Sequence, residues 1–343
     1  MFTVSNGVLT KYIKEKNEQT ITIPNNVSII GEGAFSNCRT IKAVELPDSV
    51  KKIDNKAFSN CSSLEHIKLS SGLISIGDEA FYACTNLEEI VFPNTLMQIG
   101  SRAFYGCKKI DKIEFPKYLN EIRDEAFKVC MNLGEIKFGD EIEKIGYQAF
   151  ANTRWLGLKR KESPLVIVGN ILIDAYKCKG TLVLPDKITS VSEGAFTGNS
   201  KITNMILRSS NYEADIRITR SDIVESIIKL INSSENSQEF LLKQFFDDEL
   251  KTQLAMFLAL GKGSQAGKKY LSDNIKVVAR TFIMNGDAEN FRKILSSKNI
   301  TNSNINELIN LAVEEKQIEI HSMLLAYKNN VIGFQSLSER FKL

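Results

Sequence analysis

The sequence predicts an α+β protein in which a solenoid of about eight stacked 23-residue units is followed by an all-α domain. Cysteine, and phenylalanine preceded by alanine, recur every 23 residues, and a fixed period of this size is typical of stacked repeats. The period ends after Leu207, and helical spacing of apolar residues begins at Ser221. We therefore expect a solenoid domain over residues 1–210 and a helical domain over residues 211–343. The repeated residues are Cys38, Cys61, Cys84, Cys107 and Cys130, and Phe35, Phe58, Phe81, Phe104, Phe127, Phe150 and Phe196.

Each unit contains two short extended segments and a turn. In the unit from Leu64 to Cys84, residues 64–69 alternate between apolar and polar side chains like a strand, and residues 73–76 form a second extended piece. Gly77 is expected to permit a tight turn, and residues 78–81 a brief helical turn. One side of the unit is apolar, so stacking of neighbouring units is needed to bury it.

The cysteine column is most simply a packing column. A cysteine that is not in a disulfide behaves as a small hydrophobe, and one thiol in every turn offers no defined pairing partner. Zinc sites prefer closely spaced cysteine pairs, which this sequence lacks. We therefore expect neither a metal site nor another cofactor, and unpaired thiols suit a reducing compartment.

The units follow the pattern LxxIxLPxxLxxIGxxAFxxC from about Ile21 to Leu207. In this respect the sequence resembles the BspA-like, Treponema-type leucine-rich repeat. The resemblance implies a right-handed solenoid without an active site that binds other proteins. It also implies a bacterial source, because many members of that family look like bacterial surface adhesins.

Two segments depart from the repeat. Residues 2–24 and 166–185 share an apolar run, a Gly/Asn turn, a second apolar run and a strand that ends in proline, so both predict a β-hairpin. The first hairpin would cap the N-terminal end. The second belongs to an irregular insert near residues 151–180, where Lys159 and Lys161 fall on core positions. We expect Trp155 and the basic run Lys159–Lys161 to lie in a protruding loop.

The C-terminal third predicts short helices joined by short loops, which favours antiparallel helical pairs. Residues 285–295 and 308–325 weakly resemble the second half of an ankyrin repeat, but the ankyrin TPLH signature is missing. A helical-repeat array and a plain helical bundle therefore both remain open. The expected helices are Ile223–Ile231 after an N-cap at Ser221 and Asp222, then Gln238–Leu260, Ser272–Asn285, Asp287–Ser296, Asn304–Glu315, Gln317–Tyr327 and a last turn near Phe334–Phe341.

The outward positions of the repeat strands form two columns of mixed charge. Opposite charges on neighbouring turns can stabilise the sheet by themselves, each pair by roughly 0.2–1 kcal/mol. The alternative is a surface that contacts a protein, because an open solenoid face offers an extended area. The candidate surface comprises His66, Lys68, Glu89, Val91, Lys112, Glu114, Glu135 and Lys137, together with Trp155, Lys159, Arg160 and Lys161 of the insert.

These features predict a non-enzymatic protein-interaction module. The two histidines, His66 and His321, fall in different domains, so no catalytic residue is expected. A net charge of +3 gives no support for nucleic-acid binding, and a small-molecule ligand is not expected. No apolar run could span a membrane and no secretory signal begins the chain, so a cytoplasmic location follows unless an upstream leader is missing. An exported surface adhesin and an unrecognised enzymatic activity of the helical domain are the alternatives.

Overall fold

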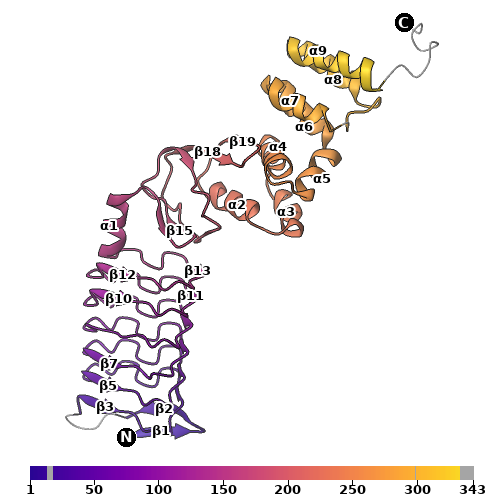
Figure 1. Ribbon diagram of the computed structural model, residues 1–343. Coiled ribbons are helices and arrows are strands. Elements are labelled where there is room, and N and C mark those ends of the chain that lie inside the picture. Colours follow the sequence, from indigo (N-terminus) through magenta and orange to yellow (C-terminus); the bar gives the residue numbers. More distant parts are fainter. Residues whose placement is uncertain (14–17, 298, 333–343) are drawn as a thin grey trace. The chain divides into compact units, whose positions relative to one another are not determined.

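The computed structural model describes residues 1–13, 18–297 and 299–332 (Figure 1). It divides into two compact units, which we treat separately. The solenoid unit comprises Met1–Gly180, Pro185–Ile202 and Arg220–Glu225, and the helical unit comprises Thr181–Leu184, Thr203–Thr219 and Ser226–Leu343. The units interleave in sequence, and the domain border near residue 210 stays a prediction.

Two parallel ladders of short strands run along the solenoid unit, which has about 8 turns with the predicted 23-residue spacing (Figure 1). Ladder A consists of the sheets β3-β5-β7 and β10-β12, and the turn of Glu89 lies between them, joined to β7 by a bridge with His66. Ladder B is an eight-stranded sheet of order β1-β2-β4-β6-β8-β9-β11-β13. The strands of ladder A are β3 (Thr20–Thr22), β5 (Ala43–Glu45), β7 (His66–Lys68), β10 (Lys112–Glu114) and β12 (Glu135–Lys137). Those of ladder B that follow the terminal hairpin are β4 (Ile29–Ile30), β6 (Lys52–Ile53), β8 (Ser75–Ile76), β9 (Gln98–Ile99), β11 (Glu121–Ile122) and β13 (Lys144–Ile145).

The third side of each turn has no strand, but its backbone still pairs between turns. The N–H of Phe58 donates to Ala80 O (2.8 Å), and that of Phe81 donates to Ala103 O (2.7 Å). Gly77 was expected to permit a tight turn, but its φ is not positive. Glycine is needed there because a Cβ would lie 2.7 Å from Asn55 N of the preceding turn.

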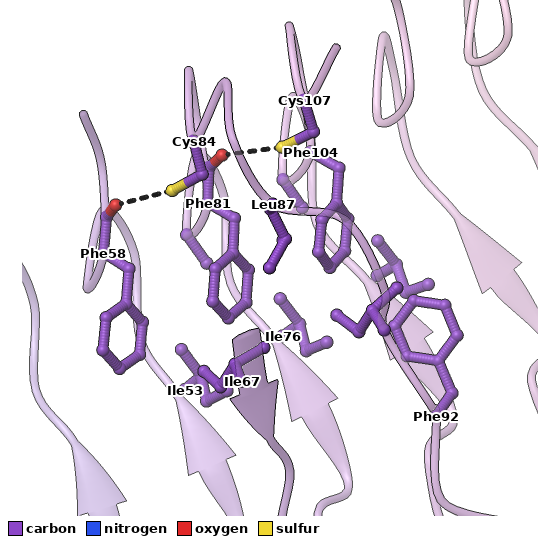
Figure 2. Packing of buried hydrophobic residues seen from close by; sticks show 14 of the residues in the cluster. Ile53, Phe58, Ile67, Ile76, Phe81, Cys84, Leu87, Phe92, Phe104 and Cys107 are labelled. Carbon is purple, nitrogen blue, oxygen red and sulfur yellow. Dashed lines mark hydrogen bonds between the residues drawn. The ribbon is translucent and has the colours of Figure 1, made fainter. Parts of the chain in front are cut away.

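The core is built from the predicted columns (Figure 2). The rings of Phe58 and Phe81 stack with centroids 5.2 Å apart and an interplanar angle of 5°, and Phe81 stacks on Phe104 at 5.0 Å. The cysteines are thiols, as expected, but they do more than fill space. Cys84 Sγ donates to Phe58 O (3.1 Å) and Cys107 Sγ to Phe81 O (3.2 Å), so each thiol ties its turn to the preceding one.

Hairpins begin two arrays of turns within the solenoid unit. β1 (Phe2–Ser5) and β2 (Val8–Tyr12) form the first, and β14 (Val166–Val168) and β15 (Ile171–Asp174) form the second. Both are antiparallel, and both carry a register irregularity in the first strand. β2 then pairs in parallel with β4, and β15 pairs in parallel with β17 (Ser190–Val191). The second hairpin therefore starts a new short array.

The expected protruding loop at residues 155–161 is wrong. These residues belong to helix α1 (Arg154–Glu162), which takes the place of the next ladder A strand. Thr153 caps the helix, because its Oγ1 accepts from Leu156 N at 3.1 Å. Lys159 and Lys161 cannot enter the core as strand residues, and a helix allows the chain to keep both side chains near solvent.

The helical unit begins with a small sheet of order β16-β18-β19, and the β18–β19 hairpin was not predicted. The strands are β16 (Gly180–Val183), β18 (Ile202–Arg208) and β19 (Glu213–Arg217). The α-helices are α2 (Asp222–Ile231), α3 (Glu235–Leu242), α4 (Asp248–Met256), α5 (Gln265–Asp273), α6 (Ile275–Asn285), α7 (Ala288–Leu295), α8 (Ile305–Glu314) and α9 (Ile318–Tyr327), and π-helical turns cover Phe257–Gly261 and Lys328–Ile332.

Two of the helix predictions need correction. The single helix expected over Gln238–Leu260 is broken between α3 and α4, where Asp247 caps α4 by accepting from Leu250 N at 2.7 Å. Helix α5 was not predicted, and Ser264 caps its start. The expected turn near Phe334–Phe341 lies outside the described residues.

The last four helices form two hairpins that are related by 30 residues. In the first, Gly286 between α6 and α7 has a φ of 65°, and Asp287 N donates to Phe282 O at 2.9 Å. In the second, Lys316 between α8 and α9 has a φ of 58°, and Gln317 N donates to Ala312 O at 2.8 Å. The same turn geometry at the same spacing favours the helical-repeat interpretation over the plain bundle for this stretch.

Candidate protein-binding surface

Ladder A presents the two predicted columns of side chains to solvent. In β7 the side chain of Ile67 is buried, whereas His66 and Lys68 on either side of it are exposed, as the alternation of a strand requires. The parallel register sets His66 opposite Ala43 and Lys112 opposite Glu135. The structure therefore brings the eight predicted column residues together on one face, and all eight are exposed.

Much of this face is occupied by charge pairs between adjacent turns. Lys112 Nζ lies 3.6 Å from Glu135 Oε1, and Lys137 Nζ lies 3.6 Å from Glu114 Oε2. Lys68 donates to Glu45, and this hydrogen bond raises the pKa of the lysine. Exposed pairs of this kind contribute little stability.

The middle of the face differs from its ends. Among the residues that the structure describes, His66 and Glu89 form no ion pair, and Val91 is 70% exposed. Val91 lies between the Glu45–Lys68 pair and the Glu114–Lys137 pair along its column. This patch of His66, Glu89 and Val91, here named the central patch, offers an aliphatic side chain beside an imidazole and a carboxylate that form no ion pair with a described residue.

Trp155 was proposed as part of the surface, but its side chain is buried and only 6% exposed. Its ring packs against Phe138 (5.5 Å between centroids) and Phe150 (5.4 Å), so it closes the core of the first array. The prediction that Trp155 lies at the binding surface is wrong, because its indole covers phenylalanines that no further turn of the array covers.

The basic residues of the insert have separate roles. Arg160 forms a bidentate ion pair with Asp174 (Nε–Oδ1 2.9 Å, Nη2–Oδ2 2.5 Å), and this pair fastens α1 to β15. The hydrogen bonds that Arg160 donates to the Asp174 carboxylate raise the pKa of Arg160. Lys159 pairs with Glu162 at 2.7 Å within the helix, and Lys161 is exposed. Within the run Lys159–Lys161, only Lys161 therefore forms no ion pair with a described residue.

A groove of about 410 Å³ lies where ladder A ends. We name it the end groove. It is lined by Ile136 and Phe138 at the end of the ladder, by one face of α1 and by β14 with Gly169. The α1 residues that face it are Trp155, Lys159 and Glu162. Lys159 and Lys161 at core positions imply that the strand before them lacks a neighbour, but they do not indicate that a groove forms there.

The rest of the described chain adds no site of another kind. No group of three or more His, Cys, Asp or Glu residues within it could hold a metal ion. His321 lies on α9, and no side-chain hydrogen bond or ion pair involves it within the described residues. None of the described helices has the length and apolar character that crossing a membrane requires.

The repeats match the family model of the BspA type leucine rich repeat region in six copies, over residues 10–133, 52–161 and 175–240. These matches cover more than half of the chain and both arrays of the solenoid unit. The chain belongs to the BspA-type leucine-rich repeat family. No curated protein sequence matches it.

Several solved structures are similar to this BspA-type repeat protein. The leucine-rich repeat protein of T. pallidum is 26% identical, with a TM-score of 0.40, over 47% of this chain and 91% of that one. A leucine-rich cell surface protein from Faecalibacterium prausnitzii is 26% identical, with a TM-score of 0.44, over 64% of this chain and 59% of that one. A leucine-rich repeat protein from Bacteroides ovatus is 23% identical, with a TM-score of 0.45, over 60% and 62%. This chain thus spans less than two thirds of the last two.

Membership of the family supports a protein-binding role for this chain, and leucine-rich repeats of this type are interaction modules rather than known enzymes. The solved relatives are bacterial proteins, which supports a bacterial origin. The surface that would bind, and the partner, are matters for proposal.

Proposed function

We propose that this protein is a non-enzymatic interaction module that binds a protein partner through ladder A, with the central patch at the middle of the contact. The observation that carries the proposal is the 70% exposure of Val91 on a sheet whose neighbouring charges are already paired with each other. Loss of water from an aliphatic side chain is favourable on binding, whereas the surrounding pairs exclude water and fix the orientation of the partner.

The repeat core supports this role because it holds the surface rigid. Each exposed column residue is flanked by a buried one, such as Ile67 beside His66 and Lys68, and adjacent turns are hydrogen-bonded along ladder B and along the third side. Side chains that are already ordered lose little conformational entropy on binding, so more of the contact energy appears as affinity.

The test is a comparison of two exposed substitutions in the full chain. A partner is captured from a lysate of the source organism by wild-type protein, identified and purified, and its affinity is measured by biolayer interferometry. Val91→Asp is expected to weaken binding at least about tenfold, because it places a carboxylate in the centre of the contact. Ile74→Asp is the matched control, since Ile74 is 45% exposed but lies outside the two columns.

The result decides between the central patch and the remainder of the surface. Unchanged binding of Val91→Asp would show that the central patch is not part of the contact. Equal weakening by Ile74→Asp would point to an effect of added negative charge rather than to the patch.

A further inference from the structure

Ladder A ends abruptly at β12. Within the described chain β12 pairs with β10 only, because the residues that should form the next strand are folded into α1. Exposed strand edges carry unpaired backbone groups and are templates for pairing with another strand. Proteins usually protect such an edge, whereas the edge of β12 borders a groove.

The register identifies the unpaired groups. Glu135 N–H donates to Asp111 O (3.2 Å), and Lys137 O accepts from Phe115 N–H (2.9 Å), so the backbone of Glu135 and Lys137 faces β10. Alternation turns the N–H and C=O of Ile136, and the N–H of Phe138, toward the opposite side. Phe138 occupies the position of Phe115 one turn later, but its N–H has no acceptor among residues 1–13, 18–297 and 299–332.

The burial of the side chains at the edge of β12 also indicates that the next strand of the ladder is missing. The inward column of ladder A is fully buried until its last member, since Val44, Ile67, Ile90 and Ile113 are 2%, 7%, 5% and 1% exposed, respectively. Ile136 is only half-buried, and so is Phe138, whereas Phe115 before it is 3% exposed. Two residues of core type are thus only partly covered at the end groove, Phe138 by Trp155.

The groove is also bounded by a second strand edge. Among the described strands β14 pairs only with β15, and its residues Val166–Val168 line the groove together with Ile136 and Phe138. The Arg160–Asp174 pair fastens α1, whose face completes the groove, to β15. The walls are therefore held in place before a ligand arrives, which lowers the cost of binding.

We propose that the end groove binds an extended segment of a partner protein, which adds to β12 as a parallel strand. The sequence order of the segment follows from the charges. β10 reads Lys-Ile-Glu and β12 reads Glu-Ile-Lys, so that each outward charge lies opposite its counterion. The strand that continues the ladder reads cation, aliphatic residue, anion, with its aliphatic side chain placed over Ile136.

The inference rests on the proposed protein-binding role, but it concerns a different site. The central patch lies on the turns of His66 and Glu89, whereas the end groove begins at the turn of Glu135. Failure of the Val91→Asp experiment would leave the groove untouched, and failure of the peptide experiment below would leave the central patch untouched.

The experiment uses the full chain and a ten-residue synthetic peptide with Lys-Ile-Glu-Phe, the order of β10, at its centre. Trp155 lines the groove and is the only tryptophan in the sequence, so its fluorescence reports binding without a label. We expect a saturable change in its emission. Methylation of the peptide's lysine or glutamate amide nitrogen, which would face β12, is expected to weaken binding about tenfold. Methylation of the isoleucine amide nitrogen, which would face away, leaves binding unchanged.

A charge exchange tests the order of the residues. In the double variant Glu135→Lys/Lys137→Glu, the affinity for the Lys-Ile-Glu peptide is expected to fall about fivefold relative to the wild type. A peptide with Glu-Ile-Lys is expected to bind the double variant more tightly than it binds the wild type. The control exchange Lys112→Glu/Glu114→Lys creates the same like-charge contacts between β10 and β12 but keeps Glu135 and Lys137, so it should not lower the affinity for the Lys-Ile-Glu peptide.

Four outcomes would overturn the proposal. The first is an unchanged Trp155 emission up to about 1 mM peptide, the range of very weak binding. Equal effects of the three N-methyl groups would indicate apolar contact without strand pairing. Tighter binding of the Glu-Ile-Lys peptide to the wild type would show an antiparallel register. A dimer in sedimentation that the peptide dissociates would make a second copy of this chain the occupant.

Discussion

Each turn of the solenoid contains residues whose backbone φ is positive. At one such position of the repeat, the residue type changes from turn to turn, and these types differ in how readily they adopt a positive φ. Asparagine and glycine adopt positive φ readily, as at Asn60 (φ 58°) and Gly106 (φ 73°). Val129 occupies the same position with a φ of 64°, although a β-branched side chain is strained there. The turn geometry of the array, rather than the local residue, therefore dictates the conformation.

Replacement of Val129 by glycine is expected to stabilise the solenoid by about 0.5–1 kcal/mol. Removal of the branched side chain relieves a strain of about 1–2 kcal/mol, and the greater freedom of glycine in the unfolded chain offsets part of this gain. The Val129 N–H keeps its hydrogen bond to Ala151 O (2.9 Å). Urea denaturation followed by circular dichroism measures the change in the free energy of unfolding.

Two further variants of the same column act as controls for that prediction. Asn60→Gly should give no gain, because asparagine already accepts a positive φ. Gly106→Val should destabilise the solenoid by about 1–2 kcal/mol. A loss of stability in Val129→Gly would show that contacts of the half-buried valine outweigh its backbone strain.

The residue columns were predictable because repetition multiplies a weak local signal. A single phenylalanine says little about burial, but a phenylalanine every 23 residues can only be the inner column of a stack. The thiol hydrogen bonds were not predictable, since they depend on the distance between Cys84 Sγ and a carbonyl 26 residues earlier in the chain. Spacing identifies which residues stack but not which atoms meet.

At the scale of elements, the repeat pattern predicted the strands of the ladders but not the helix α1 that interrupts them. Lys159 and Lys161 at core positions indicated that the repeat was broken, but a loop and a helix both satisfy that pattern. The helix is stabilised by contacts that periodicity does not report, namely the Thr153 cap and the burial of Trp155 on Phe138 and Phe150. The end groove is a consequence of this replacement, so it too could not be read from the repeat.

The ion pair between Arg160 and Asp174 is expected to be the principal fastening of α1. Arg160→Met should lower the free energy of unfolding by about 2 kcal/mol, because it leaves the Asp174 carboxylate, whose side chain is 10% exposed, without its counterion. Partial exposure of Arg160 moderates the loss. Urea denaturation, monitored by the fluorescence of Trp155 on the same helix, provides the measurement.

Lys159→Met is the matched control on that helix. Its pair with Glu162 is exposed on both sides, so the loss should stay below about 0.5 kcal/mol. Equal losses in the two variants would contradict a fastening role for Arg160 and would indicate that any cation on α1 serves equally well.

At the scale of the whole chain, the two predicted parts are present, but they are not simply consecutive. β16 of the helical unit comes before β17 of the solenoid unit, and the predicted border at residue 210 falls between the paired strands β18 and β19. The interleaving of the two units could not be predicted from the sequence. The change from the 23-residue period to helical spacing shows only where the repeat pattern ends and the helical pattern begins. It does not mark which strands pair across the change.

The solenoid unit is a one-dimensional stack, and its column of five cysteines offers a probe for five successive turns. Cys38 is half-exposed, whereas Cys61, Cys84, Cys107, Cys130 and Cys178 are buried. Burial raises the pKa of Cys107, and it raises that of Cys130 to about 12. The reactive thiolate is therefore scarce at these positions near neutral pH, in addition to being inaccessible.

Labelling of the native chain with a thiol reagent at pH 8 is expected to show one fast cysteine, Cys38, and five that react at least about a hundredfold more slowly. The slow thiols can react only after a turn opens, and opening a turn breaks its hydrogen bonds and ring stacking with both neighbours. Mass spectrometry of proteolytic fragments assigns each rate. Cys38→Ser should remove the fast phase alone, and a fast reaction at Cys84 or Cys107 would show that the middle of the stack opens independently of its ends.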